Sequence, residues 1–296
     1  MKKISKILVI VLALATLVGA CFAFAACNND DSQTITMYTE SGFAPYEFVS
    51  ANGDIIGVDV AIMSQVAENL GMKLDIQDVS FDFIPQYVAD APGYAVGAAG
   101  LTINAERLET VNFSNVYASS TLVIISSTAN AYDSVADLAG KRVGVQQGTS
   151  GDLIISAAAE GGYTYEGENG EVTVTAAGAT VQRYSTYSLV YQELVNGRID
   201  AILMDKLPGQ SLLATQGGSQ FAIIDATDLL QEDFGIALKK NADEQLVNEI
   251  NSVIDEWLAN GNLEKYTEYY TAVDNYEKNG GEAPVVPEGL KISWNV

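Results

Sequence analysis

The 296-residue sequence predicts an α/β protein whose sheets are mostly parallel. Short apolar or alternating segments, which indicate strands, recur along the chain between segments with apolar residues at helical spacing. Strands and helices that alternate in this way are typical of folds in which helices connect parallel strands. Ligands of such sheets bind at the carboxyl ends of the strands, so polar residues at those ends are the first site candidates.

The first half of the chain begins this alternation. Residues 34–38 alternate between polar and apolar side chains and predict a strand. Apolar residues then recur at helical spacing from Val58 to Leu70 and predict a helix that ends at Gly71. The other strands expected in this half are residues 73–79, 94–99 and 122–126.

The second half continues the pattern. A polar, Gly-rich loop is expected at residues 161–170, and residues 271–296 are expected to form an extended arm because of their Gly and Pro content. The expected strands are 142–145, 201–204, 222–224 and 234–238, and the expected helices are 135–138, 153–159, 188–195 and 243–259.

The amino-acid composition argues against several classes of function. The chain has 38 Asp and Glu against 15 Lys and Arg, for a net charge of −23. Such a surface repels nucleic acid, so we expect no nucleic-acid partner. The sequence has no His, the commonest general base and metal ligand. This absence disfavours hydrolytic and zinc chemistry, and we expect neither a metal nor a cofactor.

The first 27 residues read as an export signal. Lys2, Lys3 and Lys6 precede an apolar run, Ile7 to Ala20, which is shorter than a typical membrane span. The signal ends in a segment that resembles a bacterial lipobox, in which a Cys after small residues receives lipid. We prefer Cys27 because polar residues follow it.

The alternative lipidation site is Cys21, which is followed by apolar residues. We expect 1–27 to be a lipoprotein signal peptide with a lipidated, palmitate-bearing Cys27, and 28–33 to be a tether. The protein would then be membrane-anchored on the extracytoplasmic face of the cell membrane.

Several segments of the mature chain match one family in order. From about Thr34 to Tyr270 the sequence resembles the extracellular solute-binding proteins of family 3, the polar amino-acid receptors of ABC importers. The matching segments are Gly42–Phe48 (GFAPYEF), Gly57–Ile62 (GVDVAI), Gly100–Arg107 (GLTINAER), Gly144–Ser150 (GVQQGTS), Gly197–Asp205 (GRIDAILMD) and Phe234–Ala237 (FGIA).

The resemblance implies a two-lobe clamp of the periplasmic-binding-protein type II class. Each lobe would be a mostly parallel sheet flanked by helices, and a two-strand hinge near residues 126–127 and 223–225 would close the clamp around ligand. The implied boundaries are 34–125 plus 226–272 for lobe 1, 128–222 for lobe 2 and 273–296 for a C-terminal extension.

The resemblance also implies the groups that hold an amino-acid zwitterion. Arg107 would pair with the carboxylate, although a surface ion pair with Glu106 or Glu109 is the alternative. Asp205 would bind the ammonium group, and a role in capping a turn is the alternative. The other implied carboxylate contacts are Gly100, Thr102 and Ser150. For Ser150, capping of its helix is the alternative, and both roles are compatible.

The implied contacts with the ligand side chain are fewer. Phe43 would form an aromatic wall, with Phe81 or Phe83 opposite unless these two only pack in the core. Glu40 stands where relatives that choose basic ligands contact the distal cation, and a solvated loop acid is the alternative.

These expectations lead to one function and two alternatives. We expect a monomeric substrate-binding component of an amino-acid ABC importer. Its partners would be a free amino acid, with polar or basic ones favoured, and a permease and ATPase complex. The alternatives are an exported dehydratase-like enzyme on the same fold, and a ligand sensor that acts through a partner.

Overall fold

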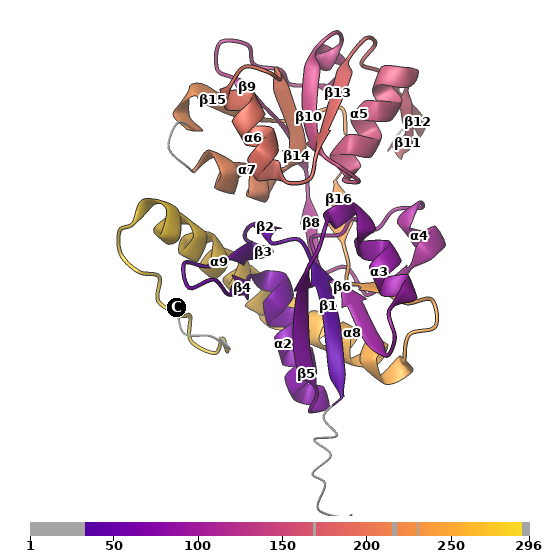
Figure 1. Ribbon diagram of the computed structural model, residues 1–296, viewed down its shortest axis with the longest axis vertical. Helices are drawn as coiled ribbons and strands as arrows, with labels where there is room; N and C mark the ends of the chain where they lie inside the picture. The colour runs from indigo at the N-terminus through magenta and orange to yellow at the C-terminus, as the bar shows by residue number, and fades with distance from the viewer. Residues whose placement is uncertain (1–32, 168–169, 215–217, 230, 292–296) are drawn as a thin grey trace, which may run out of the picture. The chain divides into compact units, whose positions relative to one another are not determined.

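Two five-stranded sheets with flanking helices dominate the computed structural model, which describes residues 33–167, 170–214, 218–229 and 231–291 (Figure 1). Both sheets belong to one compact unit that starts at Thr34. The predicted α/β class is confirmed. Each sheet is mixed, however, because each combines parallel with antiparallel strand pairs.

The first sheet contains, in spatial order, β5 (Lys73–Asp78), β1 (Thr34–Thr39), β6 (Tyr94–Gly97), β17 (Ala237–Leu238) and β7 (Asn112–Phe113). β1 runs parallel to β5 and β6, whereas β17 runs antiparallel to β6 and β7. Alternate residues of β1, such as Ile35 and Met37, are fully buried, as expected for a strand with period two.

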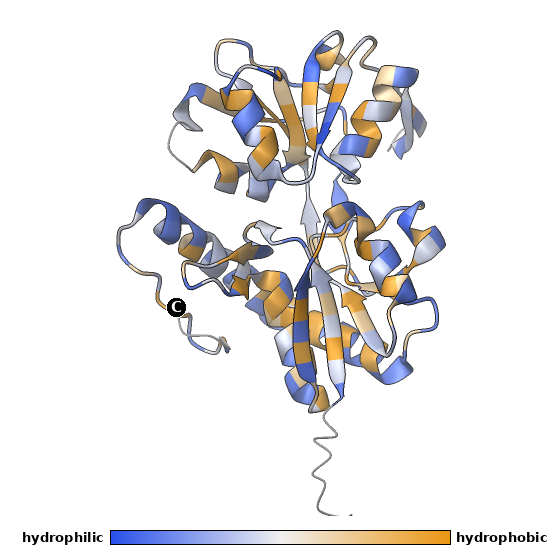
Figure 2. Cartoon of the chain, viewed as in Figure 1, coloured by the Kyte–Doolittle hydropathy of each residue, from blue (hydrophilic) through white to orange (hydrophobic). Residues whose placement is uncertain are grey.

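Helices cover this sheet with apolar faces. They are α2 (Val58–Leu70), α3 (Ile84–Asp90), the single turn α4 (Arg107–Thr110), α8 (Glu244–Asn260) and α9 (Asn262–Asn279), with a 3-10 turn, η1 (Phe81–Phe83), before α3. In α8, buried Leu246, Ile250, Val253 and Trp257 recur at helical spacing, and the opposite face is polar. Figure 2 shows this contrast along the helices.

The second sheet contains, in spatial order, β13 (Thr180–Tyr184), β10 (Arg142–Gln146), β14 (Ala201–Asp205), β9 (Leu122–Ser127) and β15 (Phe221–Asp225). The first three strands are parallel, and β9 is antiparallel to both β14 and β15. Its helices are α5 (Ser150–Glu160), α6 (Tyr187–Val195), α7 (Lys206–Leu213), η2 (Val135–Leu138) and η3 (Gly218–Gln220).

Two antiparallel segments carry the chain between the sheets. β8 (Ala118–Ser120) leads directly into β9, and β16 (Glu232–Phe234) lies between β15 and β17. The two segments pair with each other over their full length. The implied hinge residues 126–127 and 223–225 instead lie in the second sheet, where β9 pairs with β15. We therefore propose the β8–β16 pair as the hinge and residue 121 as the boundary.

Two local expectations were wrong. Residues 161–170 were expected to be a loop, but β11 (Tyr163–Gly167) and β12 (Gly170–Val174) form an antiparallel hairpin in that region. Tyr163, Tyr165 and Val172 of this hairpin pack against the core of the second sheet. The expected arm at 271–296 is also displaced, because α9 continues as far as Asn279 and buries Val273.

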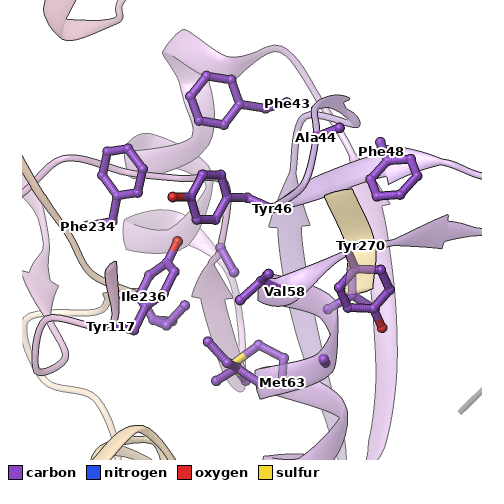
Figure 3. Close-up of a cluster of buried hydrophobic side chains, with 14 of the residues drawn as sticks. Phe43, Ala44, Tyr46, Phe48, Val58, Met63, Tyr117, Phe234, Ile236 and Tyr270 are labelled. Carbon is purple, nitrogen blue, oxygen red and sulfur yellow. The ribbon is translucent and has the colours of Figure 1, made fainter. Parts of the chain in front are cut away.

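A three-stranded sheet contains the segment that resembles the family's first ligand loop. It consists of β2 (Gly42–Phe43), β3 (Glu47–Val49) and β4 (Ile55–Ile56). Phe43 of this sheet packs against Tyr46 and Phe234, and both of these rings also contact Tyr117 (Figure 3). These rings fix the loop against the β8–β16 region.

Candidate functional site

The expected site residues lie at the carboxyl ends of parallel strands from both sheets. Glu40 follows β1 and Asp205 ends β14. The segments after β6 and β10 supply Thr102 and Ser150. Three hydrogen bonds join these strand ends across the two sheets: Gln146 to Glu40, Arg107 to Gly148, and Ser150 to Thr102. The structure therefore brings the expected residues to one place.

Arg107 is buried at the start of α4, with 8% of its surface exposed. Its Nη1 atom donates to the carbonyl of Thr102 (2.8 Å) and its Nη2 atom to that of Gly148 (3.1 Å). Burial lowers its pKa to about 10, while the charges of Glu232 and Asp205 act in the opposite sense, so the guanidinium is charged at neutral pH. These contacts are not those of a surface ion pair with Glu106 or Glu109.

The helix start expected to bind an anion is α5. Ser150 is its first residue, but the capping residue is Thr149, whose Oγ1 accepts from the backbone N–H of Asp152. The alternative that Ser150 serves as the cap is therefore wrong. Ser150 Oγ does not cap the helix and instead donates to Thr102 Oγ1 (3.0 Å). This hydrogen bond joins two hydroxyl groups from segments that follow strands of different sheets.

Asp205 ends an apolar strand, with 6% of its surface exposed. Within the described part of the chain, its buried Oδ1 atom has no hydrogen-bond partner. Burial, followed by the charge of Glu232, raises the pKa of Asp205 to about 8, and a hydrogen bond from Ser120 opposes the shift. A carboxyl group in this state lacks a cationic donor, which an ammonium group would supply.

Glu40 is buried as well, which argues against a solvated loop acid. Its Oε2 atom accepts a hydrogen bond from the Gln146 side chain (2.9 Å). Burial raises the pKa of Glu40 to about 7, the amide of Gln146 lowers it, and the charge of Asp78 adds to the rise. A cation beside this carboxylate would relieve the cost of burying its charge.

The expected aromatic residues lie in different surroundings. Phe43 stacks on Tyr187 of α6, with ring centroids 6.1 Å apart. Phe81 faces the guanidinium of Arg107, whose Cζ atom lies 5.3 Å from the ring centre. Phe83, the alternative to Phe81, is half exposed. The ring opposite Phe43 in this structure is thus Tyr187, which the sequence analysis did not select.

Gly100 allows the backbone to approach this aromatic group. Its φ is +56°, and a Cβ atom at this position would lie 2.5 Å from Cε1 of Phe43. Its N–H donates to Oδ2 of Asp59 (3.0 Å), which also accepts from the hydroxyl of Tyr117 (2.9 Å). A larger residue at position 100 would therefore displace Phe43 or strain the chain.

Asp59 and Glu47 form a buried pair of carboxyl groups beneath the site. Both side chains are fully buried. Burial raises the pKa of Asp59 to about 6 and, with the charge of Asp59 adding to the effect, raises that of Glu47 well above its usual range. The ionised member holds Gly100 and Tyr117, so this pair supports the segment that leads to Thr102.

Glu232 of β16 is the main site residue that the sequence analysis missed. Its Oε2 atom accepts a hydrogen bond from Thr102 Oγ1 (3.1 Å). Burial raises its pKa, while Ser150, Thr102 and Arg107 oppose the rise. It stands in an acidic stretch between two expected strands, and such a stretch ordinarily indicates a solvated loop. For Tyr187, the available signal was its position shortly after the carboxyl end of β13.

Two cavities border the site. One of about 490 Å³ is lined by Phe81, Arg107, Gly148 and Asp152, among others. The other, of about 400 Å³, is lined by Thr102, Ser150 and Glu232 and by residues of the β11–β12 hairpin. Neither is lined by Glu40, Phe43 or Asp205.

Two features are absent from the described ranges. Among these residues, no three or more His, Cys, Asp or Glu side chains gather in a way that could hold a metal ion. None of the helices in this part of the chain combines the length and apolar character that a bilayer crossing requires. Cys21, Cys27 and the expected tether lie outside the described residues.

The chain is similar to several characterised proteins over most of its length. The arginine-binding extracellular protein ArtP of Bacillus subtilis (strain 168) is 26% identical over 260 residues, which cover 85% of this chain and 94% of the relative. The L-arginine-binding protein of Pseudomonas aeruginosa is 28% identical over 273 residues, 90% of this chain and 97% of the relative.

A solved structure agrees with these relatives. That of an ancestral arginine-binding protein bound to arginine superposes with a TM-score of 0.69 at 28% identity, over 80% of this chain and 97% of the other. Residues 35–273 match the family described as bacterial extracellular solute-binding proteins, family 3. The chain belongs to that family, and its fold is the two-lobe, type II clamp of amino-acid binding proteins.

Proposed function

We propose that the protein is the substrate-binding component of an amino-acid ABC importer and captures a free cationic amino acid outside the cell. Arg107 binds the ligand carboxylate, together with Thr102 and Ser150. The N–H of Gly100, which was expected to contact the same carboxylate, instead donates to Asp59. Asp205 binds the ammonium group. Glu40 binds the cationic end of the side chain, and Phe43 and Phe81 line its path.

One observation carries this proposal: three carboxyl groups at the joined strand ends, Glu40, Asp205 and Glu232, have pKa values that burial raises. The charges of two of them, Glu232 and Asp205, act on the buried guanidinium of Arg107. A ligand with one carboxylate and two cationic groups balances such a site better than a neutral amino acid does. The names of the arginine-binding relatives support the same ligand class.

The proposal extends to location and assembly. Lipid on Cys27 anchors the protein to the extracytoplasmic face of the membrane, where a monomer delivers ligand to a permease and ATPase complex. The relatives named above are binding proteins, and we propose that this chain likewise catalyses no reaction. The sensor alternative would require a signalling partner.

A ligand panel tests the proposal directly. We expect arginine, lysine or ornithine to raise the melting temperature most among the twenty standard amino acids, cystine and ornithine. At ~100 times its dissociation constant a ligand stabilises the protein by ~2.7 kcal/mol. Calorimetry then measures affinity. No stabilisation by any member of the panel would contradict amino-acid binding, and a strong preference for glutamine or cystine would contradict only the cationic ligand.

A further inference from the structure

A chain of hydroxyl groups ends on Glu232. Ser150 Oγ donates to Thr102 Oγ1 (3.0 Å), and Thr102 Oγ1 donates to Oε2 of Glu232 (3.1 Å). Each hydroxyl group has a single proton to donate. In this arrangement both protons are therefore committed, and neither hydroxyl can donate to a second carboxylate without leaving its present acceptor.

Electrostatic interactions also favour Glu232 as the acceptor at this place. Arg107, Thr102 and Ser150 all stabilise its ionised form. These are the groups that the proposed function assigns to the carboxylate of the ligand. Glu232 thus holds, from within the chain, the interactions that an incoming α-carboxylate requires.

The cavity of about 400 Å³ lies next to this side chain. It is bordered by Glu232 together with Leu153, Tyr163, Tyr165 and Leu229. Glu232 itself is only partly buried by the surrounding chain. The carboxylate therefore has space into which it can turn when another anion takes its partners.

We propose that Glu232 is an internal competitor of the ligand's α-carboxylate, which must displace it from Thr102 and Ser150 on binding. This inference rests on the proposed function. Glu232 is then an affinity-determining residue that lowers affinity for ligands with a free carboxylate. It has little effect on analogues without one. The carboxylate of Glu232 repels a ligand carboxylate, whereas it does not repel an uncharged amide, which also competes less strongly for the same hydrogen-bond donors.

The test compares two ligands on three proteins. L-arginine and L-argininamide are titrated by calorimetry into the wild type, Glu232→Gln and Asp233→Asn. Asp233 is the matched control, because it is the adjacent residue and carries the same charge, but it is exposed and accepts from Ser119. We expect Glu232→Gln to bind arginine about tenfold more tightly and argininamide with an affinity within about twofold of the wild type.

The ratio of the two affinities separates competition from a structural role. A structural role of Glu232 would change both affinities together, and the inference is overturned if the ratio stays at the wild-type value or if arginine binds more weakly. Glu232→Ala provides a second variant, in which the ratio should rise as well. Failure of every protein to bind either ligand would instead overturn the proposed function, and this inference with it.

Discussion

Gln146 Nε2 donates a 2.9 Å hydrogen bond to Oε2 of Glu40 and so links the end of β10 to the end of β1. The same amide nitrogen donates to the carbonyl of Ser185 (3.0 Å), which fixes its orientation. A neutral amide stabilises a carboxylate without neutralising it. The geometry thus keeps Glu40 in place for a cationic partner.

Replacing Glu40 with Gln should change which side chains the protein prefers. Removal of one partner from a desolvated charge pair costs ~2–5 kcal/mol, so arginine binding should fall at least ~30-fold. Glutamine binding should change little. Calorimetry measures both, and Glu109→Gln, which removes the same charge from an exposed position, is the control. Equal losses for arginine and glutamine would contradict the assignment of Glu40 to the ligand's distal cation.

Arg107 and Asp205 should be indispensable for every amino acid that binds. Arg107→Ala and Asp205→Asn each leave a ligand charge buried without its partner, so affinity should fall at least ~30-fold. Arg107→Lys should recover only part of this loss because an ammonium group cannot form a bidentate pair. Isothermal titration measures these changes. Arg198→Ala, which removes an exposed arginine paired with Glu193, is the control. Folded variants that bind within about threefold of the wild type would rule out the zwitterion clamp.

Stability of the ligand-free protein should fall as the pH rises from about 5 to about 8. The pKa values of Glu40, Asp59 and Asp205 are raised to about 7, about 6 and about 8. The folded protein therefore holds more protons than the unfolded chain in this range, and deprotonation favours unfolding. We expect the melting temperature to fall by more than about 4 °C. Asp205→Asn should flatten the profile, and a melting temperature that rises with pH would contradict these shifts.

Ligand binding should reverse part of this effect. A cationic amino acid favours the ionised forms of Glu40 and Asp205, so binding releases protons below about pH 8, and affinity should increase with pH over the same range. Calorimetry in two buffers with different ionisation enthalpies measures the number of protons released. Asp205→Asn should release fewer protons than the wild type. Net proton uptake by the wild type would show that the two carboxyl groups are not the ligand's partners.

The mature protein should begin with a lipidated Cys27. Mass spectrometry of protein extracted from membranes should show the added mass of acyl chains on a peptide that starts at this residue. Cys27→Ser should abolish the modification, and Cys21→Ser should leave it in place. An intact Met1, or acyl groups on Cys21, would contradict this prediction.

The sequence was most informative where a local pattern also determines a local structure. The spacing of Val58, Ile62 and Val66 predicts α2, and the buried strand before Asp205 predicts β14. The family motifs predicted that Arg107, Thr102 and Ser150 belong to one site. Glu232 could not be found in this way, because its burial depends on residues about 80 and 130 positions earlier in the chain. The expected hinge residues 126–127 and 223–225 lie inside the second sheet for a similar reason, since nothing within β9 reveals which sheet it joins.

Two tertiary contacts explain the other errors. The hairpin at Tyr163–Val174 has many Gly and polar residues, which predict a loop. Its tyrosines stabilise the strand pair by packing against the core of the second sheet, which is formed by residues distant in sequence. In α9, Tyr266 and Tyr270 stack on each other, and Val273 joins the same core. The Gly and Pro residues predicted an arm from Thr271, but the irregular segment begins only after α9 ends at Asn279.

The end of α9 also contacts α7, which packs on the second sheet. Ser211 Oγ donates to Asp274 (2.8 Å), and Lys278 donates to both Asp274 and the carbonyl of Ser211. Rotation about the β8–β16 pair, the proposed hinge, would break this contact, so its strength would contribute to the fraction of molecules that are closed before ligand arrives. Apparent affinity scales with that fraction. Changes at Ser211 or Lys278 would therefore retune the receptor to a different ambient ligand concentration without altering its selectivity.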